Sequence, residues 1–163
     1  MKPISALKFL MTLVLVITLI SCEDKEQERA VTEKEVHPLV LQIFNQAYPG
    51  ATIKEYAEEI EGEQKYYEIS CEFEGRKIDA IYQADGTVTA IEEVITVESL
   101  PNNIQQAIAK EFQQFSIKFA EKIEKQGKTF FEVKLLDTNN QKNYELLFTD
   151  TGRLIEKDLT DEE

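Results

Sequence analysis

An internal repeat constrains the fold of this chain more than any other feature of its sequence. Residues 48–69 align with residues 112–133 at an offset of 64, with three identities: Ile53/Ile117, Lys54/Lys118 and Glu68/Glu132. Four more pairs keep their chemistry: Tyr48/Phe112, Tyr66/Phe130, Tyr67/Phe131 and Ile69/Val133. After a two-residue insertion near Asn139 the offset becomes 66, which pairs Ile81/Leu147, Tyr82/Phe148, Gly86/Gly152 and Val88/Leu154. Such a repeat predicts two copies of one structural unit, over residues 36–97 and 98–159, followed by an acidic tail at 160–163.

Each unit is predicted to begin with a helix and to continue with four strands. Pro38 and Pro101 suit the first turn of a helix, where a missing N–H group costs nothing. An apolar stripe follows each proline: Val40, Ile43, Phe44 and Ala47 in the first unit, and Ile104, Ala107, Ile108 and Phe112 in the second. Alternating apolar residues and turn signals such as Asp85-Gly86 predict the strands. Their expected ranges are 52–60, 65–73, 77–83, 87–95, 116–123, 129–136, 143–149 and 153–159.

This order of elements predicts an α+β fold. A four-stranded antiparallel meander has one apolar face, and a single helix can cover it. We therefore expect two tandem α-β-β-β-β units that form antiparallel sheets with the helices packed on one face. The pattern leaves open whether the units join sheet edges or stack helices. Because a unit of about 62 residues is near the lower limit for independent folding, we expect both to share a core in one compact body.

The first 21 residues read as a targeting segment. Lys2 and Lys8 precede twelve uncharged residues, 9–20, whose helical length of roughly 18 Å is short of a bilayer core of about 30 Å. The run ends in Leu19-Ile20-Ser21-Cys22, which resembles the lipobox of bacterial lipoproteins. That resemblance implies removal of residues 1–21 and acylation of Cys22. A permanent membrane span and a free thiol are the alternatives.

Residues 22–35 are expected to link this lipidated cysteine to the folded body as a flexible acidic tether. Nine of the thirteen residues from 23 to 35 are charged, and only Ala30 and Val31 are apolar. We expect a protein of the cell envelope that is lipid-anchored to a bacterial membrane, most readily the outer membrane. Periplasmic and surface-facing display both remain open. A net charge of −13 without a basic stripe argues against nucleic acid as a partner.

The motifs of the repeat resemble a known family. They are Tyr48-Pro49-Gly50-Ala51 after the helix, the strand Tyr66-Tyr67-Glu68-Ile69, and the hairpin from Ile81 to Gly86. In this order they resemble the PepSY-like domains, which are also described as similar to β-lactamase-inhibitor protein. The resemblance covers residues 36–159 and implies tandem helix-plus-four-strand units that form a concave eight-stranded sheet. It implies no catalytic residues, and a fold does not by itself transmit a function.

Catalytic, metal and cofactor sites find little support in the sequence. His37 is the only histidine, and its place before Pro38 is typical of a helix entry. The pairs Glu58-Glu59 and Glu92-Glu93 are expected to be solvated, as is the acidic C-terminus. Residues 137–141 have part of the oxygen pattern of a calcium loop, but Asx-rich turns have the same pattern. Cys71 is interpreted as a small buried side chain. We therefore expect no enzyme, no cofactor and no metal.

Strand alternation predicts a binding surface on the face of the sheet away from the helices. If Tyr67, Ile69 and Cys71 point to the core, their neighbours point outward. The predicted surface comprises Tyr56, Tyr66, Glu68, Ile81, Phe130, Glu132 and Leu147. The alternation is ambiguous in the first strand of each unit. Tyr56 is predicted to point outward, whereas Phe119, which is one position away from the repeat equivalent of Tyr56, is predicted to point inward. A β-bulge could reconcile the two predictions. The outward rings could instead shield neighbouring strands or the contact between the units.

These observations favour a non-enzymatic module that binds a protein or peptide, in the manner of an inhibitor. Its aromatic side chains would supply burial, and its carboxylates would attract a partner from the envelope with a basic patch. Two other hypotheses are a calcium or small-ligand sensor and an enzyme that uses carboxylate catalysis.

Overall fold

The computed structural model describes residues 27–160. Two α-helices of ten residues each lie in this range, α1 (Pro38–Ala47) and α2 (Asn102–Glu111), with the short 3-10 helices η2 (Glu33–Glu35) and η3 (Val97–Ser99) before them. The strands are β1 (Gln27–Val31), β2 (Thr52–Glu61), β3 (Gln64–Phe73), β4 (Arg76–Gln83), β5 (Val88–Val94), β6 (Phe115–Lys125), β7 (Lys128–Asp137), β8 (Asn143–Thr149) and β9 (Leu154–Thr160). Both helices predicted from the sequence are confirmed, and so are the eight predicted strands, whose ends differ by at most two residues.

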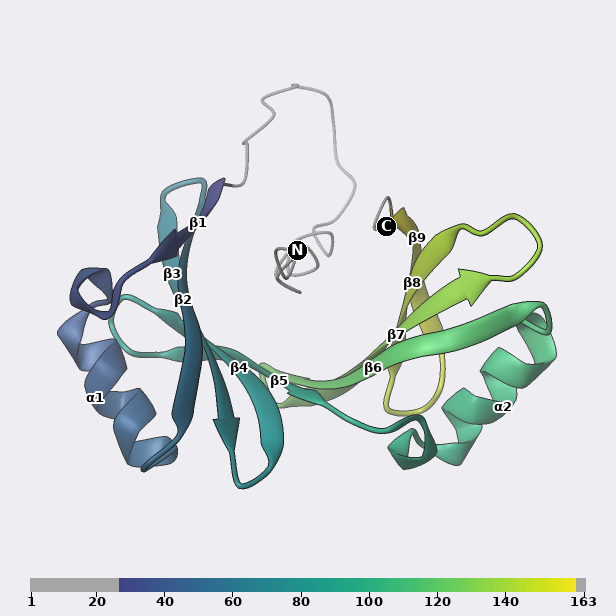
Figure 1. Cartoon of the computed structure of the whole chain (residues 1–163), viewed down its shortest axis with the longest axis horizontal. Coiled ribbons are helices and arrows are strands. Elements are labelled where there is room, and N and C mark those ends of the chain that lie inside the picture. The colour runs from purple at the N-terminus through teal and green to yellow at the C-terminus, as the bar shows by residue number, and fades with distance from the viewer. Residues whose placement is uncertain (1–26, 161–163) are drawn as a thin grey trace.

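All nine strands belong to one antiparallel sheet in which the strand order follows the sequence. Each helix is followed by four strands, and β5 pairs with β6 over Ala90–Val94 and Glu121–Lys125. This pairing decides a question that the sequence left open, since the two halves are joined by strand edges into a continuous sheet. Figure 1 shows the sheet as a curved surface, with α1 and α2 outside the curve at its two ends.

The apolar core consists of two separate clusters. The first packs α1 against β3 and β4, and the second packs α2 against β7 and β8. Among the described residues no buried member belongs to both clusters, although Ile91 borders the first and Ile95 the second. The expectation of a shared core is therefore wrong. Backbone pairing across β5 and β6 provides the continuity instead, and each helix packs on strands of its own half.

Helix α1 begins as the sequence predicts, whereas Pro101 lies one position before the first turn of α2, as its N-cap. Pro38 occupies the first turn of α1, and the Nδ1 atom of His37 accepts a hydrogen bond from the backbone N–H of Leu39 at 3.3 Å. This side-chain cap satisfies one of the free donors at the helix start. It explains the only histidine as a structural residue. Cys71 is buried in the cluster under α1, as expected.

The predicted tether is partly folded. Gln27–Val31 pairs with β2 as strand β1, and η2 follows it, so the expectation of a flexible segment is wrong for residues 27–35. Arg29 forms ion pairs with Glu58 at 3.2 Å and with Glu35 at 3.0 Å, while Glu35 accepts a hydrogen bond from the backbone N–H of Thr32. Charges that look solvated in the sequence are thus paired with charges from another strand. The predicted signal peptide, the predicted lipidation site Cys22 and the acidic residues 161–163 lie outside the described residues.

The described part of the chain contains no helix with the length and hydropathy needed to cross a bilayer.

Candidate functional site

Most of the buried carboxylates lie on the face of the sheet opposite the cluster under α1. In β3, Tyr67, Ile69 and Cys71 pack in the cluster under α1, so Tyr66 and Glu68 point to the opposite face. We call this opposite face the acidic face. It is defined by residues in β3 to β8: Tyr66, Glu68, Asp79, Ile81, Glu92, Glu121, Phe130, Glu132 and Leu147.

The register of the strands brings acids of both halves together where β5 meets β6. Asp79 on β4 lies beside Glu92 on β5. Glu121 on β6 lies beside Glu132 on β7, and its neighbour on β5 is Val94. Residues 92 and 94 point to the same face of β5. The row of Asp79 and Glu92 is therefore next to the row of Val94, Glu121 and Glu132. An acidic cluster therefore crosses the junction between the halves, with carboxyl groups from four strands.

Three of these carboxylates are almost fully buried. The exposed fraction is 3% for Glu92, 2% for Glu121 and 0% for Glu132. Burial removes water from the charged form, and this raises the pKa of Glu121 to about 8 and the pKa of Glu92 well above its usual value. The neighbouring carboxylates add to both shifts by repulsion, from Asp79 on Glu121 and from Glu121 on Glu92. Burial, followed by the charge of Glu145, also raises the pKa of Glu132.

Lysines at the border of the cluster neutralise part of this charge. Lys134 Nζ lies 3.9 Å from Glu132 Oε1 and 3.8 Å from Glu145 Oε2, and it lies over the ring of Phe119 at 5.6 Å from its centroid. Lys54 forms an ion pair with Glu72 at 3.1 Å. The hydroxyl of Ser70 donates a hydrogen bond to Glu68 at 3.3 Å.

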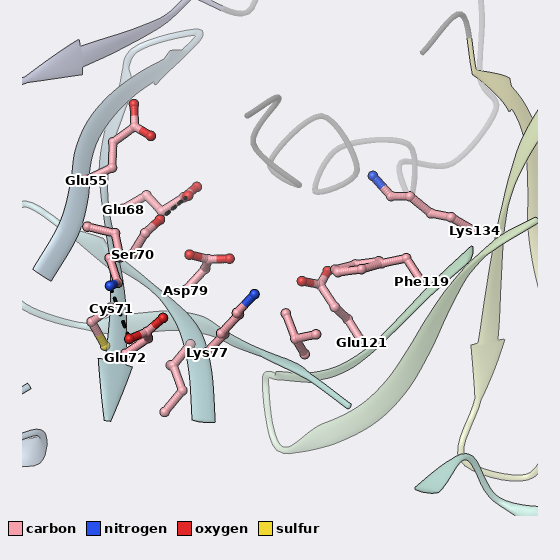
Figure 2. A pocket seen from close by; sticks show the side chains of 13 residues that line it. Glu55, Glu68, Ser70, Cys71, Glu72, Lys77, Asp79, Phe119, Glu121 and Lys134 are labelled. Carbon is pink, nitrogen blue, oxygen red and sulfur yellow. Dashed lines mark hydrogen bonds and ion pairs between the residues drawn. The ribbon is translucent and has the colours of Figure 1, made fainter. Parts of the chain in front are cut away.

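A pocket of about 410 Å³ opens between these groups. Its lining comes from both halves, and five acids and three lysines border it: Glu55, Glu68, Glu72, Asp79, Glu121, Lys54, Lys77 and Lys134. Figure 2 shows Asp79 and Lys77 pointing into the pocket from one half, and Glu121 and Phe119 from the other. Such a volume is within the range of sites for small molecules or single side chains. The arrangement can hold a cation.

The structure brings six of the seven predicted surface residues to the acidic face. Tyr66 and Phe130 are partly exposed, whereas Glu68, Ile81, Glu132 and Leu147 are buried. Tyr66 packs on Ile81 and Ala90. The prediction that these residues form an exposed surface is thus wrong for four of them, because the curved sheet and their neighbours cover them.

Tyr56 does not belong to this face. It lies opposite Ile69 and packs on the cluster under α1, while Phe119 lines the pocket on the acidic face. The predictions for both side chains are therefore wrong: Tyr56 points to the core and Phe119 points to the acidic face. The register shifts between Ile53 and Glu55 and, at the equivalent position, between Ile117 and Phe119. The extra residue of each bulge exchanges the faces for every residue that follows it.

Sequence reasoning missed Asp79, Glu92 and Glu121, and it assigned the carboxylate pairs to solvent. Glu58, Glu59 and Glu92 are buried, so that interpretation is wrong for them. Glu58 is held in its ionised form, since Lys65 at 2.8 Å and Arg29 lower its pKa. Strand alternation would have placed Asp79 and Glu92 on the acidic face. Only the pairing of β5 with β6, however, brings them next to Glu121.

The candidate calcium loop forms Asx turns. Asp137 accepts a hydrogen bond from the backbone N–H of Asn139 at 2.9 Å, and Asn140 accepts one from Lys142 at 3.0 Å. Its side-chain oxygens thus bind the loop's own backbone. Within residues 27–160 no group of three or more His, Cys, Asp or Glu side chains is arranged to hold a metal ion.

Solved structures with the same fold come from Bacteroides. A DUF2874 family protein of Bacteroides uniformis superposes with a TM-score of 0.64 at 18% identity, over 75% of this chain and 88% of that one. A protein of Bacteroides eggerthii described as "putative periplasmic" gives 0.66 at 17% identity, over 75% and 87%. A BLIP-like protein of Bacteroides fragilis gives 0.60 at 21% identity, over 77% and 86%. At these identities the likeness shows the fold.

The sequence itself assigns the family. The model of the family described as "Putative beta-lactamase-inhibitor-like, PepSY-like" matches residues 22–90 and 73–156. The chain therefore belongs to the PepSY-like family, and the resemblance seen in the sequence is confirmed. None of the curated protein sequences compared with this chain matches it.

Proposed function

We propose that this protein is a non-enzymatic module of the cell envelope that binds a protein or peptide on its acidic face. The observation that carries the proposal is the composition of that face, where partly exposed Tyr66 and Phe130 flank carboxylates from both halves of the sheet. Aromatic rings framed by charges are typical of protein-recognition surfaces. A net charge of −13 favours a basic partner through long-range attraction.

The proposed location is the envelope of a bacterium, with Cys22 as the lipid attachment site and the outer membrane as the anchoring membrane. Two facts support it: the lipobox-like residues Leu19 to Cys22, and the periplasmic description of a protein with the same fold. The family's β-lactamase-inhibitor description supports binding rather than catalysis.

We also propose that the two halves are copies of one module with both helices on the same face of the sheet. The register shifts recur at equivalent positions, between Ile53 and Glu55 and between Ile117 and Phe119. A second pair of shifts follows Ile81 and Leu147, which the repeat also aligns. The strand register supports a common face for both cores. Ile78 of one core lies opposite Glu93, Glu93 lies opposite Lys122, and Lys122 lies opposite Phe131 of the other core. Directly opposite residues point to the same side of a sheet. Duplication would give a partner two similar binding areas side by side.

The binding proposal is tested by crosslinking in intact envelopes, followed by purification of the crosslinked partner and a binding titration. Tyr66→Ala and Phe130→Ala should each weaken that partner by about tenfold or more, because buried aromatic anchors commonly contribute over 1 kcal/mol. Leu39→Ala, at a side chain on α1 that is 38% exposed, serves as the control and should bind as the wild type does. Equal affinities of all four proteins, with unchanged circular dichroism, would refute the proposal.

A further inference from the structure

We infer that the pocket at the junction of β5 and β6 receives a basic side chain, an arginine or a lysine, from the polypeptide partner. The inference rests on the proposed binding function and assigns its central contact. Acids from both halves border the pocket, so the contact exists only where the two halves are joined as one sheet.

The charge balance of the pocket favours a cation. Of the five acids that line it, Glu72 is paired with Lys54 at 3.1 Å. Lys134 is shared with Glu132 and Glu145, which lie outside the lining. Lys77 is the third lysine, which leaves more carboxylates than ammonium groups facing the pocket. A positive group from a partner would reduce this excess of acids.

Glu121 gives independent evidence that a ligand group is missing. Its side chain is 98% buried, as its exposed fraction of 2% implies, and it points into the pocket (Figure 2). Its Oε2 atom has no hydrogen-bond partner among the described residues. A buried carboxylate oxygen without a donor costs free energy, and a guanidinium or ammonium group from a partner would supply that donor.

The shape and lining favour an organic cation. The pocket, at about 410 Å³, is far larger than a single ion, and its lining includes Val94 and Phe119 as well as charged residues. Arginine and lysine combine a charged end with an apolar stem and therefore match both kinds of lining. A guanidinium can also donate to two carboxylates at once, such as Asp79 and Glu121 on opposite sides of the pocket.

The protonation of Glu121 provides a second readout. The groups that act on it are Asp79, Glu68 and Glu145, which raise its pKa, and Lys134, which lowers it; Glu132 and Glu92 lie on the neighbouring strands. Its pKa of about 8 means that this carboxyl is largely protonated at pH 6. A bound cation favours the ionised form, so cation binding should release a proton and strengthen from pH 6 to pH 8.

The test is a titration of the purified protein with the peptide acetyl-Gly-Arg-Gly-amide, followed by amide NMR. The control peptide carries citrulline, which has nearly the same shape and no charge. We expect saturable shifts at the pocket strands β4, β5 and β6 with the arginine peptide, and about tenfold weaker binding or none with the citrulline peptide. The combined variant Asp79→Asn with Glu121→Gln should also bind about tenfold more weakly. Glu98→Gln with Glu111→Gln, two exposed acids outside the acidic face, is the matched control and should leave the affinity unchanged.

Equal binding of both peptides, or unchanged binding in the Asp79/Glu121 variant, would overturn the inference. A titration with spermidine distinguishes a partner side chain from a free polyamine. If spermidine shifts the same amides to saturation and the arginine peptide does not, the pocket binds a free polyamine, and the inference of a partner side chain is overturned. The crosslinked partner distinguishes the two proposals. If Phe130→Ala loses the partner and the Asp79/Glu121 variant keeps it, the binding function stands and the pocket assignment fails.

Discussion

Gly86 and Gly152 show how closely single residues set the fit between a turn and a helix. Both have positive φ angles, 85° and 81°, and both lie under the first turns of the helices. A Cβ atom at Gly86 would overlap Ile43 Cδ1 in α1, and one at Gly152 would lie 2.9 Å from Asn103 Nδ2 in α2. The repeat therefore preserves these glycines for a steric reason as well as for the backbone conformation.

Gly86→Ala is expected to lower the free energy of unfolding by roughly 2–4 kcal/mol, because it adds an overlap with Ile43 to the cost of a left-handed alanine. Gly62→Ala is the control, since Gly62 has a φ of 58° but no atom within 4 Å of its added Cβ. It should cost only about 1 kcal/mol. Urea unfolding of the two variants measures the difference. Equal losses of unfolding free energy would show that the contact between residue 86 and α1 does not contribute to stability.

The raised pKa of Glu121 predicts a stability that falls with pH. The folded state holds this proton up to a pKa of about 8, whereas the unfolded chain releases it near the usual value of 4.5. The folded state therefore binds more protons between these values, and its stability is greatest below pH 4.5 and decreases as the pH rises to 8. Glu121→Gln should remove this contribution, at most about 5 kcal/mol. The measurement is urea unfolding at pH 5 and pH 8, and a variant with the same pH dependence as the wild type would contradict the assignment.

Strand β1 is the element that sequence patterns could not reveal. Elements that depend on local periodicity were predicted: α1 from its apolar stripe, and the eight strands β2 to β9 with ends within two residues. The contacts that hold β1 are instead non-local, because Arg29 pairs with Glu58, 29 positions away. The faces of β2 and β6 were misassigned for a related reason, since each bulge depends on the partner strand. Local chemistry thus defines elements, and pairing defines which side chains meet at the acidic face.

β1 is expected to exchange its amide hydrogens slowly and as a unit. Arg29→Ala removes ion pairs to both Glu58 and Glu35, and it should raise hydrogen exchange in residues 27–31 by a few-fold, roughly twofold to fivefold. Lys54→Ala, which removes an exposed pair with Glu72, is the control and should leave β1 unchanged. Hydrogen exchange with mass spectrometry measures both. Fast exchange of β1 in the wild type would mean that the strand is not stably paired.

The whole molecule combines one sheet with two cores, and this predicts uneven unfolding. Ile69 and Val133 are equivalent under the repeat and fully buried in different clusters. Ile69→Ala and Val133→Ala should each cost about 2–4 kcal/mol, and each should raise hydrogen exchange mainly in its own half. The halves are then units that open separately. Equal loss of protection in both halves from either variant would show that the β5–β6 junction makes the molecule one cooperative unit.

If Cys22 carries a lipid, as proposed, the pairing of β1 limits the distance between the folded sheet and the membrane. Only residues 23–26 separate Cys22 from Gln27, and a chain over five Cα–Cα steps reaches roughly 18 Å at most. With a lipid on Cys22, as proposed, the edge of the sheet at β1 would stay within that distance of the lipid headgroups. A partner would then have to approach along the bilayer surface. This geometry favours neighbours that are themselves bound to the same leaflet.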